Sequence, residues 1–394
     1  MIHAAERTSE RPGISGFGLT SSPLPPSAYL DEEVLRREQV NIFRSLWIFA
    51  GPKQLVSDDN AYITRTIGGI PLVIQNLGGT IRAFENQCLH RRMALQWDPV
   101  GQRPLICKYH GWTYDNDLRV KGVPNAAYYE LTDECRRSLR LREFAVREVG
   151  NLLFVNLSDP PPPFEDQFSA SFVSTMEQAS LHFDSEVAYA RFDERYNWKL
   201  NFENVLDYNH VQFIHPKSFF PILRQRLNAE NNQFELSPRI RPIQAQLDVN
   251  APIDLRELSY HSHSPLDVNV EWWASQVDRY GNVDDYYNWF IYPNVNFCSV
   301  HGRMFLIQQF IPTAPDISEY HLWVMTARRR DRRTQFTPLL WALIKAEKEV
   351  IDEDAVALEQ LQKKLHLDSD RCQHGIYEAH IVRMMRWYAN AMSM

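Results

Sequence analysis

The alternation of apolar and polar residues predicts a strand-rich segment between residues 50 and 157. Short apolar runs alternate there with paired glycines, which is typical of strands joined by tight turns. The runs occupy residues 61–67, 71–75 and 81–84, and the glycine pairs occupy positions 68–69 and 78–79. Residues 158–163 read Ser-Asp-Pro-Pro-Pro-Pro, which cannot continue a strand. The pattern therefore predicts a small all-β domain that ends before this proline run.

The remainder of the chain mixes strand-like and helix-like patterns. Apolar runs at residues 288–292 and 303–311 predict buried strands. Residues 337–367 instead repeat apolar residues at helical spacing, which predicts one long helix with a single buried side. The apolar residues on that side are Leu340, Ile344, Ile351, Leu358, Leu361 and Leu365.

These patterns divide the chain into three parts. Residues 1–49 begin as a proline-rich tail and continue from residue 28 as a capped amphipathic helix. Residues 50–157 form the small domain, and residues 158–394 form a larger one. A chain of 394 residues is long enough to bury a core in each domain.

Two short motifs in the small domain bring thiols and imidazoles together. Cys88 and His90 are separated by one residue, and Cys107 and His110 by two. A Rieske [2Fe–2S] cluster takes two Cys on one iron and two His on the other, so each motif would supply one ligand to each iron. Zinc also accepts two Cys and two His, but a zinc finger places its Cys pair before its His pair. The alternating order therefore favours the iron–sulfur cluster, with both ligand loops expected at hairpin tips.

A second constellation lies in residues 197–216, which we read as a helix. His210 and His215 follow Asp207 there. Two His and one carboxylate form a facial triad that leaves open positions at Fe(II) for O₂ and substrate. Paired His near an Asp are more often structural residues, so this motif gains weight only from the Rieske motif that precedes it.

The residues around both motifs resemble the Rieske non-haem iron oxygenases, also called ring-hydroxylating oxygenase terminal components. The matching stretches are Ala83–Leu95, which includes Cys88 and His90, Cys107–Asp115, and the segment with both later His. The resemblance implies that Gly111 lets the backbone approach the cluster. It also implies that Trp112 and Tyr114 shield the cluster from water or donate a hydrogen bond to its sulfur, although both rings also suit an ordinary strand core.

The same resemblance suggests the third iron ligand. In the family's late acidic segment, the ligand Asp precedes a Glu by five residues and a Gln by eight, a pattern that Asp354, Glu359 and Gln362 match. Asp352 and Glu353 are alternative ligands. The segment is also compatible with a solvated acidic turn.

Asp207 matches the family residue that bridges an iron-ligand His to a cluster-ligand His of the neighbouring subunit. Carried onto this chain, Asp207 would connect His210 with His110 of another copy. This role implies a ring-shaped oligomer, usually a homotrimer, in some members with a beta subunit. Asn204 resembles a polar residue near the iron, and it equally suits a helix surface.

The resemblance also implies the fold class and the partners. The expected fold is α+β, with a small all-β Rieske domain and a catalytic domain whose antiparallel sheet wraps around a long helix. The expected cofactors are a [2Fe–2S] cluster and Fe(2+), with O₂ as co-substrate. Electrons would come from a ferredoxin or flavin reductase, and ultimately from NAD(P)H.

Charge and cysteine usage narrow the partners and the compartment. The net charge of −7 and the lack of a basic patch argue against nucleic acid, and no apolar run has the length of a membrane span. The one basic run, residues 328–333, reads as a solvated loop. Cys135, Cys298 and Cys372 are scattered and odd in number, and the N-terminus does not resemble a signal peptide, so we expect a cytoplasmic protein.

The sequence leaves the reaction and the substrate open. The main predicted reaction is hydroxylation of an aromatic or other hydrophobic small molecule, and oxidative O- or N-demethylation is the alternative. The short interval from Asn204 to Asp207 resembles the demethylase branch, whereas residues 380–388 resemble the ring-dioxygenase branch. Two hypotheses from other functional classes are a Rieske electron carrier and a non-catalytic binding protein. Tyr260, His261 and His263 are expected in a surface loop.

Overall fold

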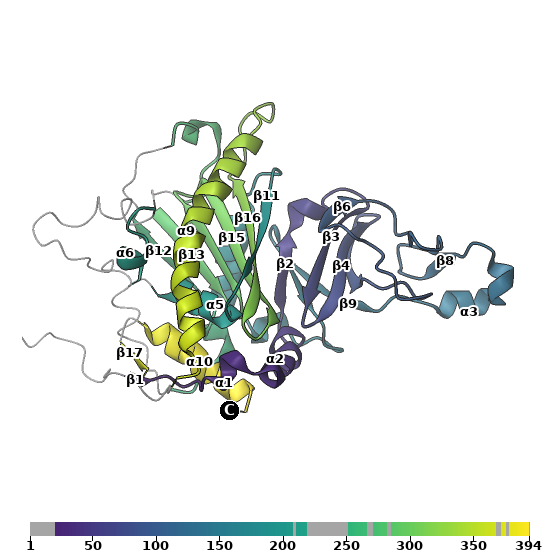
Figure 1. Ribbon diagram of the computed structural model, residues 1–394. Coiled ribbons are helices and arrows are strands. Elements are labelled where there is room, and N and C mark those ends of the chain that lie inside the picture. The colour runs from purple at the N-terminus through teal and green to yellow at the C-terminus, as the bar shows by residue number, and fades with distance from the viewer. Residues whose placement is uncertain are drawn as a thin grey trace, which may run out of the picture.

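Two β-sheets lie beside each other along an elongated molecule (Figure 1). This computed structural model describes residues 20–207, 210–218, 251–265, 271–281, 285–367, 372–375 and 378–393. The seven-stranded sheet belongs to the small domain, and the six-stranded sheet belongs to the larger one. This arrangement confirms the predicted α+β fold. Among the described residues, no helix has the length and apolarity that a membrane crossing requires.

The sheet of the small domain is antiparallel throughout, in the order β2-β10-β9-β5-β4-β3-β6. Its strands are β2 (Ile48–Pro52), β3 (Ala61–Ile67), β4 (Ile70–Leu77), β5 (Thr80–Glu85), β6 (Val100–Gln102), β9 (Glu143–Val149) and β10 (Leu152–Asn156). A second small sheet pairs β7 (Thr113–Tyr114) with β8 (Val120–Gly122), and the short helix α3 (Asp133–Ser138) follows it. The predicted glycine turns are present, with Gly68 and Gly78 in the left-handed region.

The hairpin-tip prediction is confirmed for one of the two ligand loops. The second loop turns between Ile106 and Thr113, which form an antiparallel bridge, and the Tyr114 amide donates to the Leu105 carbonyl beside it. The first loop does not join neighbouring strands, because it connects β5 to β6, which are separated in the sheet by β4 and β3. Sequence alternation identifies strands but not their neighbours, which is why the first loop looked like a hairpin.

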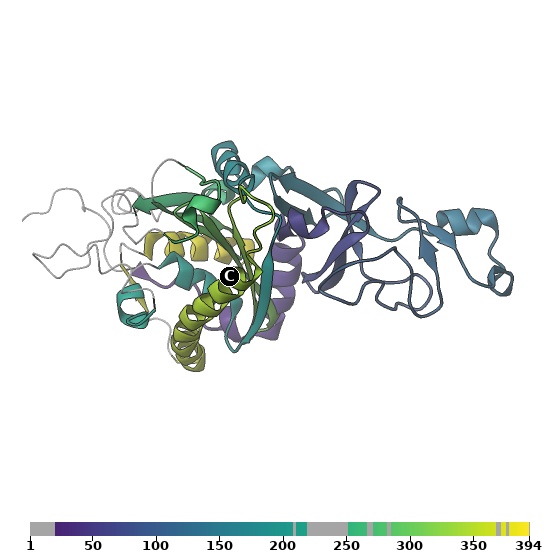
Figure 2. The same cartoon turned by 90° about the horizontal axis from the view of Figure 1, so that it is seen from above.

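The sheet of the larger domain is antiparallel in the order β11-β16-β15-β14-β13-β12. These strands are β11 (Ala188–Glu194), β12 (Tyr260–Pro265), β13 (Asp285–Ile291), β14 (Val295–Val300), β15 (Met304–Ala314) and β16 (Ile317–Thr326). Helix α4 (Ala170–Ser180) and the long helix α9 (Thr337–Lys364) cover opposite faces of this sheet (Figure 2). The helix α10 (Ala379–Ala391) lies on the same side as α9, and β1 (Thr20–Ser21) pairs with β17 (Gln373–His374).

Helix α9 has the predicted length and most of its predicted buried side. Leu340, Ile344, Ile351 and Leu358 are buried, whereas Leu361 is 53% exposed. The periodicity marks a side that could be buried, but the neighbouring elements decide where that side is covered. The prediction was therefore wrong for Leu361.

The N-terminal helix begins where the sequence predicted, and it is divided at Asp31. It consists of α1 (Ser27–Leu30) and α2 (Glu32–Glu38), and the Asp31 side chain caps α2 by accepting from the Glu33 amide. A π-helical turn over Gln39–Phe43 follows, after which the chain enters β2 at Ile48.

Of the two segments predicted as loops, the first forms a strand, whereas the basic run is the predicted exposed loop except at Arg329. Tyr260, His261 and His263 lie in the edge strand β12, where the His261 ring packs 5.0 Å from the Trp289 ring and burial lowers the pKa of His261 to about 4. Within the basic run, Arg329 is nearly buried and its guanidinium pairs with Asp184 at 2.8 Å. Asp184, the partner of Arg329, and Trp289, the partner of His261, are distant in the sequence. Local composition therefore could not predict either contact.

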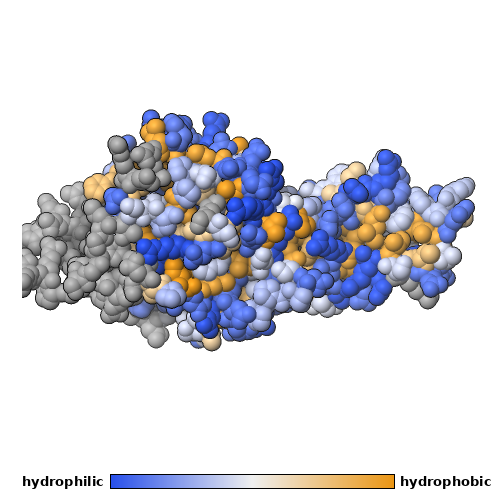
Figure 3. Space-filling model, turned by 90° about the horizontal axis from the view of Figure 1, so that it is seen from below, coloured by the Kyte–Doolittle hydropathy of each residue, from blue (hydrophilic) through white to orange (hydrophobic). Residues whose placement is uncertain are grey.

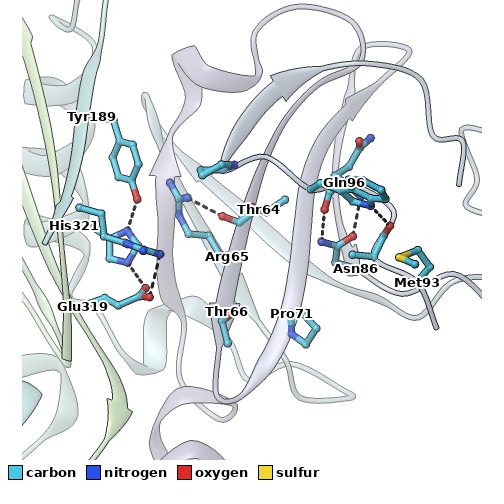
Figure 4. Close-up of a pocket in the computed structure, with 14 residues that line it drawn as sticks. Thr64, Arg65, Thr66, Pro71, Asn86, Met93, Gln96, Tyr189, Glu319 and His321 are labelled. Carbon is cyan, nitrogen blue, oxygen red and sulfur yellow. Dashed lines mark hydrogen bonds and ion pairs between the residues drawn. The ribbon is translucent and has the colours of Figure 1, made fainter. Parts of the chain in front are cut away.

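A layer of polar and aromatic side chains joins the two domains (Figure 4). The buried Arg65 of β3 donates to the Ala50 carbonyl, and its guanidinium lies 5.1 Å from the Trp323 ring of β16. His321 contacts the Tyr189 hydroxyl at 2.8 Å and the Glu319 carboxylate at 3.0 Å. These contacts fix the small domain against the edge of the larger sheet.

A buried ion pair ties the N-terminal helix to the larger domain. The Glu38 carboxylate lies 2.5 Å from Lys199 Nζ, and both side chains are 1% exposed. Glu38 also accepts from the Trp198 indole and the Tyr388 hydroxyl. Lys199 lies on α5 (Trp198–Leu206), so the pair anchors the helix that leads to Asp207.

We predict that Lys199→Met lowers the free energy of unfolding by about 3–5 kcal/mol, because it leaves the Glu38 carboxylate buried without its cation. Urea unfolding followed by Trp fluorescence measures the change. Arg36→Met is the matched control, since the Arg36–Glu33 pair is exposed and contributes about 1 kcal/mol or less. Equal losses in the two variants would contradict the role given to the buried pair.

Candidate metal centres

Four donor groups from two loops converge at the end of the small domain. The Cys88 and Cys107 thiols are buried, and the His90 and His110 rings lie with centroids 4.5 Å apart. The Nδ1 atoms of both His are buried without a hydrogen-bond partner. Buried polar atoms rarely lack partners, so these unpaired nitrogens beside two thiols fit a missing shared ligand. Two thiolates and two imidazoles match the donor set of a Rieske cluster.

The aromatic residues after the second loop support these donors. Trp112 stacks on His90, with centroids 5.2 Å apart and ring planes 2° from parallel. The Tyr114 hydroxyl accepts from the Leu89 amide at 3.0 Å and lies 3.2 Å from Cys88 Sγ. The hydroxyl is therefore within hydrogen-bond distance of the sulfur, at the place where the sequence predicted a donor.

The second group of donors lies in the larger domain between α6 (Val211–Ile214) and α9. His215 Nε2 is 3.1 Å and His210 Nε2 is 3.6 Å from Asp354 Oδ1. One ligand atom from each of the three residues lies within 4.8 Å of the others. Asp354 Oδ1 is buried and has no hydrogen-bond partner. Two imidazoles and a carboxylate in this arrangement fit a mononuclear iron.

The geometry separates the three carboxylates that the sequence offered as ligands. Asp352 is exposed and pairs with Lys348. Glu353 contacts the other ring nitrogen of His215, Nδ1, at 2.9 Å and also accepts from Ser218. Only Asp354 faces both Nε2 atoms, so it is the candidate ligand, whereas Glu353 orients the His215 ring.

Electrostatics at His215 depend on these two carboxylates. Burial lowers the pKa of His215, but the neighbouring Asp354 and Glu353 carboxylates outweigh burial and raise it overall. A metal ion binds the neutral imidazole and would replace the proton that the carboxylates attract. The same pair of carboxylates would then orient the ring and compensate the charge of the ion.

The predicted continuous helix over the His motif is broken at Asp207. Helix α5 starts at an Asn197 cap and ends at Leu206, after which Asp207 is extended. His210 precedes α6, and its Nδ1 lies 3.6 Å from Asp207 Oδ2. Asp207 is therefore close to His210 because the chain turns between two helices. Asn204 and Asp207 both line a cavity of about 520 Å³ between α5, α9 and α10.

The two centres lie toward opposite ends of the folded molecule. Figure 1 shows the β7–β8 sheet, which directly follows the second cluster loop, at the far end of the molecule from α6. Asp207 therefore does not reach His110 within one chain.

Comparison with known proteins identifies both domains. Residues 46–138 match the Rieske [2Fe-2S] domain, and residues 178–394 match the catalytic domain of the ring-hydroxylating alpha subunit. The chain belongs to the ring-hydroxylating alpha-subunit family. The two matched domains carry a [2Fe–2S] cluster and a mononuclear iron, which confirms the predicted cofactors.

Curated relatives match about half of the chain. The glycine betaine monooxygenase oxygenase subunit of Chromohalobacter salexigens is 32% identical over 202 residues, 49% of this chain and 43% of the relative. The carnitine monooxygenase oxygenase subunit of Escherichia coli is 27% identical over 200 residues, 49% of this chain and 52% of the relative. The chain thus spans about half the length of the curated relatives it matches.

Solved structures share the fold over nearly the whole chain. The quaternary ammonium Rieske monooxygenase CntA aligns with a TM-score of 0.72 at 19% identity, covering 95% of this chain and 96% of the other. Naphthalene 1,2-dioxygenase from Rhodococcus sp. aligns with a TM-score of 0.68 at 15% identity, covering 94% of each chain. These alignments confirm the predicted two-domain architecture.

We predict that the purified protein holds about three irons per chain and that His215→Ala lowers this to about two, because the iron triad loses a ligand while the cluster keeps all four. Metal analysis with acid-labile sulfide measures both centres, and the Rieske EPR signal reports the cluster. His263→Ala, in the edge strand, is the control. Loss of the EPR signal in His215→Ala, or zinc in place of iron, would overturn the assignment.

A second prediction concerns the Tyr114 hydroxyl. Tyr114→Phe removes a hydrogen bond to Cys88 Sγ that stabilises the more negative, reduced cluster, so the reduction potential should fall while the cluster stays bound. Spectroelectrochemical titration measures the potential. Tyr128→Phe alters an exposed tyrosine of the same domain and should leave the potential unchanged. An unchanged potential in Tyr114→Phe would show that the hydroxyl does not act on the cluster.

Proposed function

We propose that this protein is a terminal oxygenase, which takes electrons from a ferredoxin or flavin reductase and uses O₂ to hydroxylate a hydrophobic small molecule. The observation that carries the proposal is the convergence of His210, His215 and Asp354 in a chain that also has a Rieske domain. A facial triad supplies open positions at Fe(II) where O₂ and substrate can meet. An electron carrier would need no second metal centre.

The side chains of this chain would hold the iron ligands and connect the two centres. Glu353 fixes the His215 ring through Nδ1, and Asp207 lies beside the corresponding nitrogen of His210. Asp207 would use its remaining carboxylate oxygen to accept a hydrogen bond from His110 of another copy. This contact would join a cluster to an iron by two imidazoles and one carboxylate.

Two features support transfer between subunits. The centres of one chain lie far apart (Figure 1), and the cluster loops expose apolar side chains. Leu89, Trp97, Ile106 and Tyr109 are exposed in these loops, and Figure 3 shows hydrophobic surface on the small domain. Exposed apolar surface is typical of an interaction site. We propose a homotrimer in which each cluster faces the iron of the next subunit, in the reducing cytoplasm, where free thiols persist.

Oxidative demethylation is a second candidate reaction. Relatives of this chain are named as monooxygenases of glycine betaine and of carnitine, whereas another is named as a terephthalate dioxygenase component. Hydroxylation of a methyl group on nitrogen or oxygen leads to its loss as an aldehyde, so the same centre can serve both reactions. The proposed substrates are therefore hydrophobic or methylated small molecules.

Product analysis tests the proposed function directly. The iron-loaded protein, a surrogate reductase and ¹⁸O₂ are incubated with aromatic acids and with methylated amines. Label in a product that requires NAD(P)H and disappears in His215→Ala supports an oxygenase. Reduction of the cluster without labelled product from either compound class would instead support the electron carrier.

We predict that Asp207→Asn abolishes turnover while both metals remain bound, because the amide keeps the size of the side chain but cannot hold two imidazoles by their N–H groups. Metal analysis and single-turnover reoxidation of the reduced cluster measure binding and transfer separately. Asn204→Ala, which alters another residue of the same cavity, should keep the transfer rate within a few-fold of the native value.

Mixed oligomers test whether the site is shared. When Asp207→Asn chains are combined with His110→Cys chains, some junctions pair an intact cluster with an intact Asp207, so part of the activity should return. Each variant alone is the control. Verified mixed oligomers without recovered activity, or a fully active monomer, would place the transfer within one chain.

A further inference from the structure

Four arginines gather on one surface of the small domain, and we call this surface the arginine patch. Arg82 lies on β5, Arg119 directly precedes β8, and both Arg140 and Arg142 precede β9. Arg119 and Arg140 are opposite each other in an antiparallel bridge. Arg140 also lines a cavity of about 530 Å³ together with Arg82 and Arg142. The patch is therefore assembled from three separate parts of the chain, beside β8 at the outer end of the molecule (Figure 1).

The patch carries more positive than negative charge. Arg119 and Arg140 bring like charges together across the bridge, an arrangement that destabilises a strand pair. Glu143 pairs with both Arg82 and Arg140, and Asp117 pairs with Arg82 at 3.0 Å. Two carboxylates thus serve four guanidinium groups. The remaining positive charge makes the patch attractive to an anionic partner.

Arg142 is the most available cation of the patch. It is exposed, and its guanidinium lies 4.9 Å from the centre of the Phe144 ring. Within the described parts of the chain, Arg142 forms no ion pair. Because Asp117 and Glu143 lie among the arginines, they would repel the continuous phosphates of a nucleic acid. A protein with separate acidic side chains fits this mixed surface better.

Buried leucines connect the patch to the cluster thiols. Leu118 and Leu141 directly adjoin patch arginines in the sequence, and the Leu141 amide donates to the Leu118 carbonyl at 3.0 Å. Both leucine side chains are buried in the same apolar cluster as Cys88 and Cys107. The patch therefore lies over the packed side chains that enclose the thiols. A protein that docks on the patch comes close to the [2Fe–2S] site without covering the exposed ends of the ligand loops.

We infer that the arginine patch is the docking surface for an acidic electron-donor protein of the ferredoxin class. This inference rests on the proposed function, because it names the surface on which the donor of that function docks. The reduced donor would lose one electron and the [2Fe–2S] cluster would gain it, with no bond made or broken. The exposed cluster loops, which the proposed function assigns to contact with another copy, then stay available for that contact during reduction.

Reduction of the cluster by a protein donor tests this surface. A plant-type ferredoxin, which is acidic, is reduced and mixed anaerobically with the oxidised holoenzyme, and the Rieske absorbance gives the second-order rate constant. This rate constant should fall as salt rises, because opposite charges steer the encounter. The double variant Arg119→Glu/Arg142→Glu should lower it at least about tenfold at low salt. Arg119→Glu also places an acid opposite Arg140, which favours the bridge.

Arg332→Glu/Arg333→Glu is the matched control, because it makes the same charge change at two exposed arginines of the larger domain. It should keep the rate constant within about twofold of the native value, since distant charges are screened. Dithionite, a small reductant that needs no docking surface, should reduce the clusters of native protein and both variants at equal rates.

Equal rate constants in the patch and control variants, or a native rate constant that does not fall with salt, would overturn the inference. So would a loss of rate in Arg92→Glu/Lys108→Glu, which alters exposed cations of the ligand loops, without a loss in the patch variant. The measurement requires neither O₂ nor turnover. Reduction that depends on the patch in a protein that forms no labelled product would therefore contradict the proposed oxygenase and leave the docking surface intact.

Discussion

The whole catalytic domain depends on one contact, that of Asp354 with His210 and His215. The two sides of this contact are more than a hundred residues apart in the chain, and each is a group that is costly to bury alone. The long helix α9 must therefore be held firmly against the sheet and against α5. The apolar side of α9 packs on the sheet, and the buried Glu38–Lys199 pair holds α5 from its other end. A shift of α9 by a single residue would rotate Asp354 away from both rings.

The second constraint is the separation of the two centres. Arg65, Tyr189 and His321 attach the small domain to the outer edge of the larger sheet (Figure 4), and α6 lies on the other side of that sheet in Figure 1. This attachment is polar. The separation of the two centres supports the proposed transfer of electrons to the iron of another subunit. The exposed apolar side chains of the cluster loops fit that proposal.

Short-range patterns could be read from the sequence, and long-range contacts could not. The Cys-His and His-His spacings lie within a few residues, so their chemistry was visible before the fold. Asp354 was chosen from three adjacent carboxylates only by resemblance, because nothing local distinguishes them. The Arg329–Asp184 and Glu347–Gln308 contacts join residues that are 145 and 39 positions apart. The sheet order, which moved the first cluster loop away from a hairpin tip, is likewise set by contacts between distant strands.

The geometry of α9 explains why carboxylates on one helix have different surroundings. Successive residues of a helix are rotated by about 100°, whereas residues seven apart lie almost in line. Asp354 and Glu347 therefore lie on the same side of α9. Asp354 faces the two Nε2 atoms, and Glu347 contacts Gln308 of the sheet. Glu353 is rotated from Asp354 and meets the opposite nitrogen of His215.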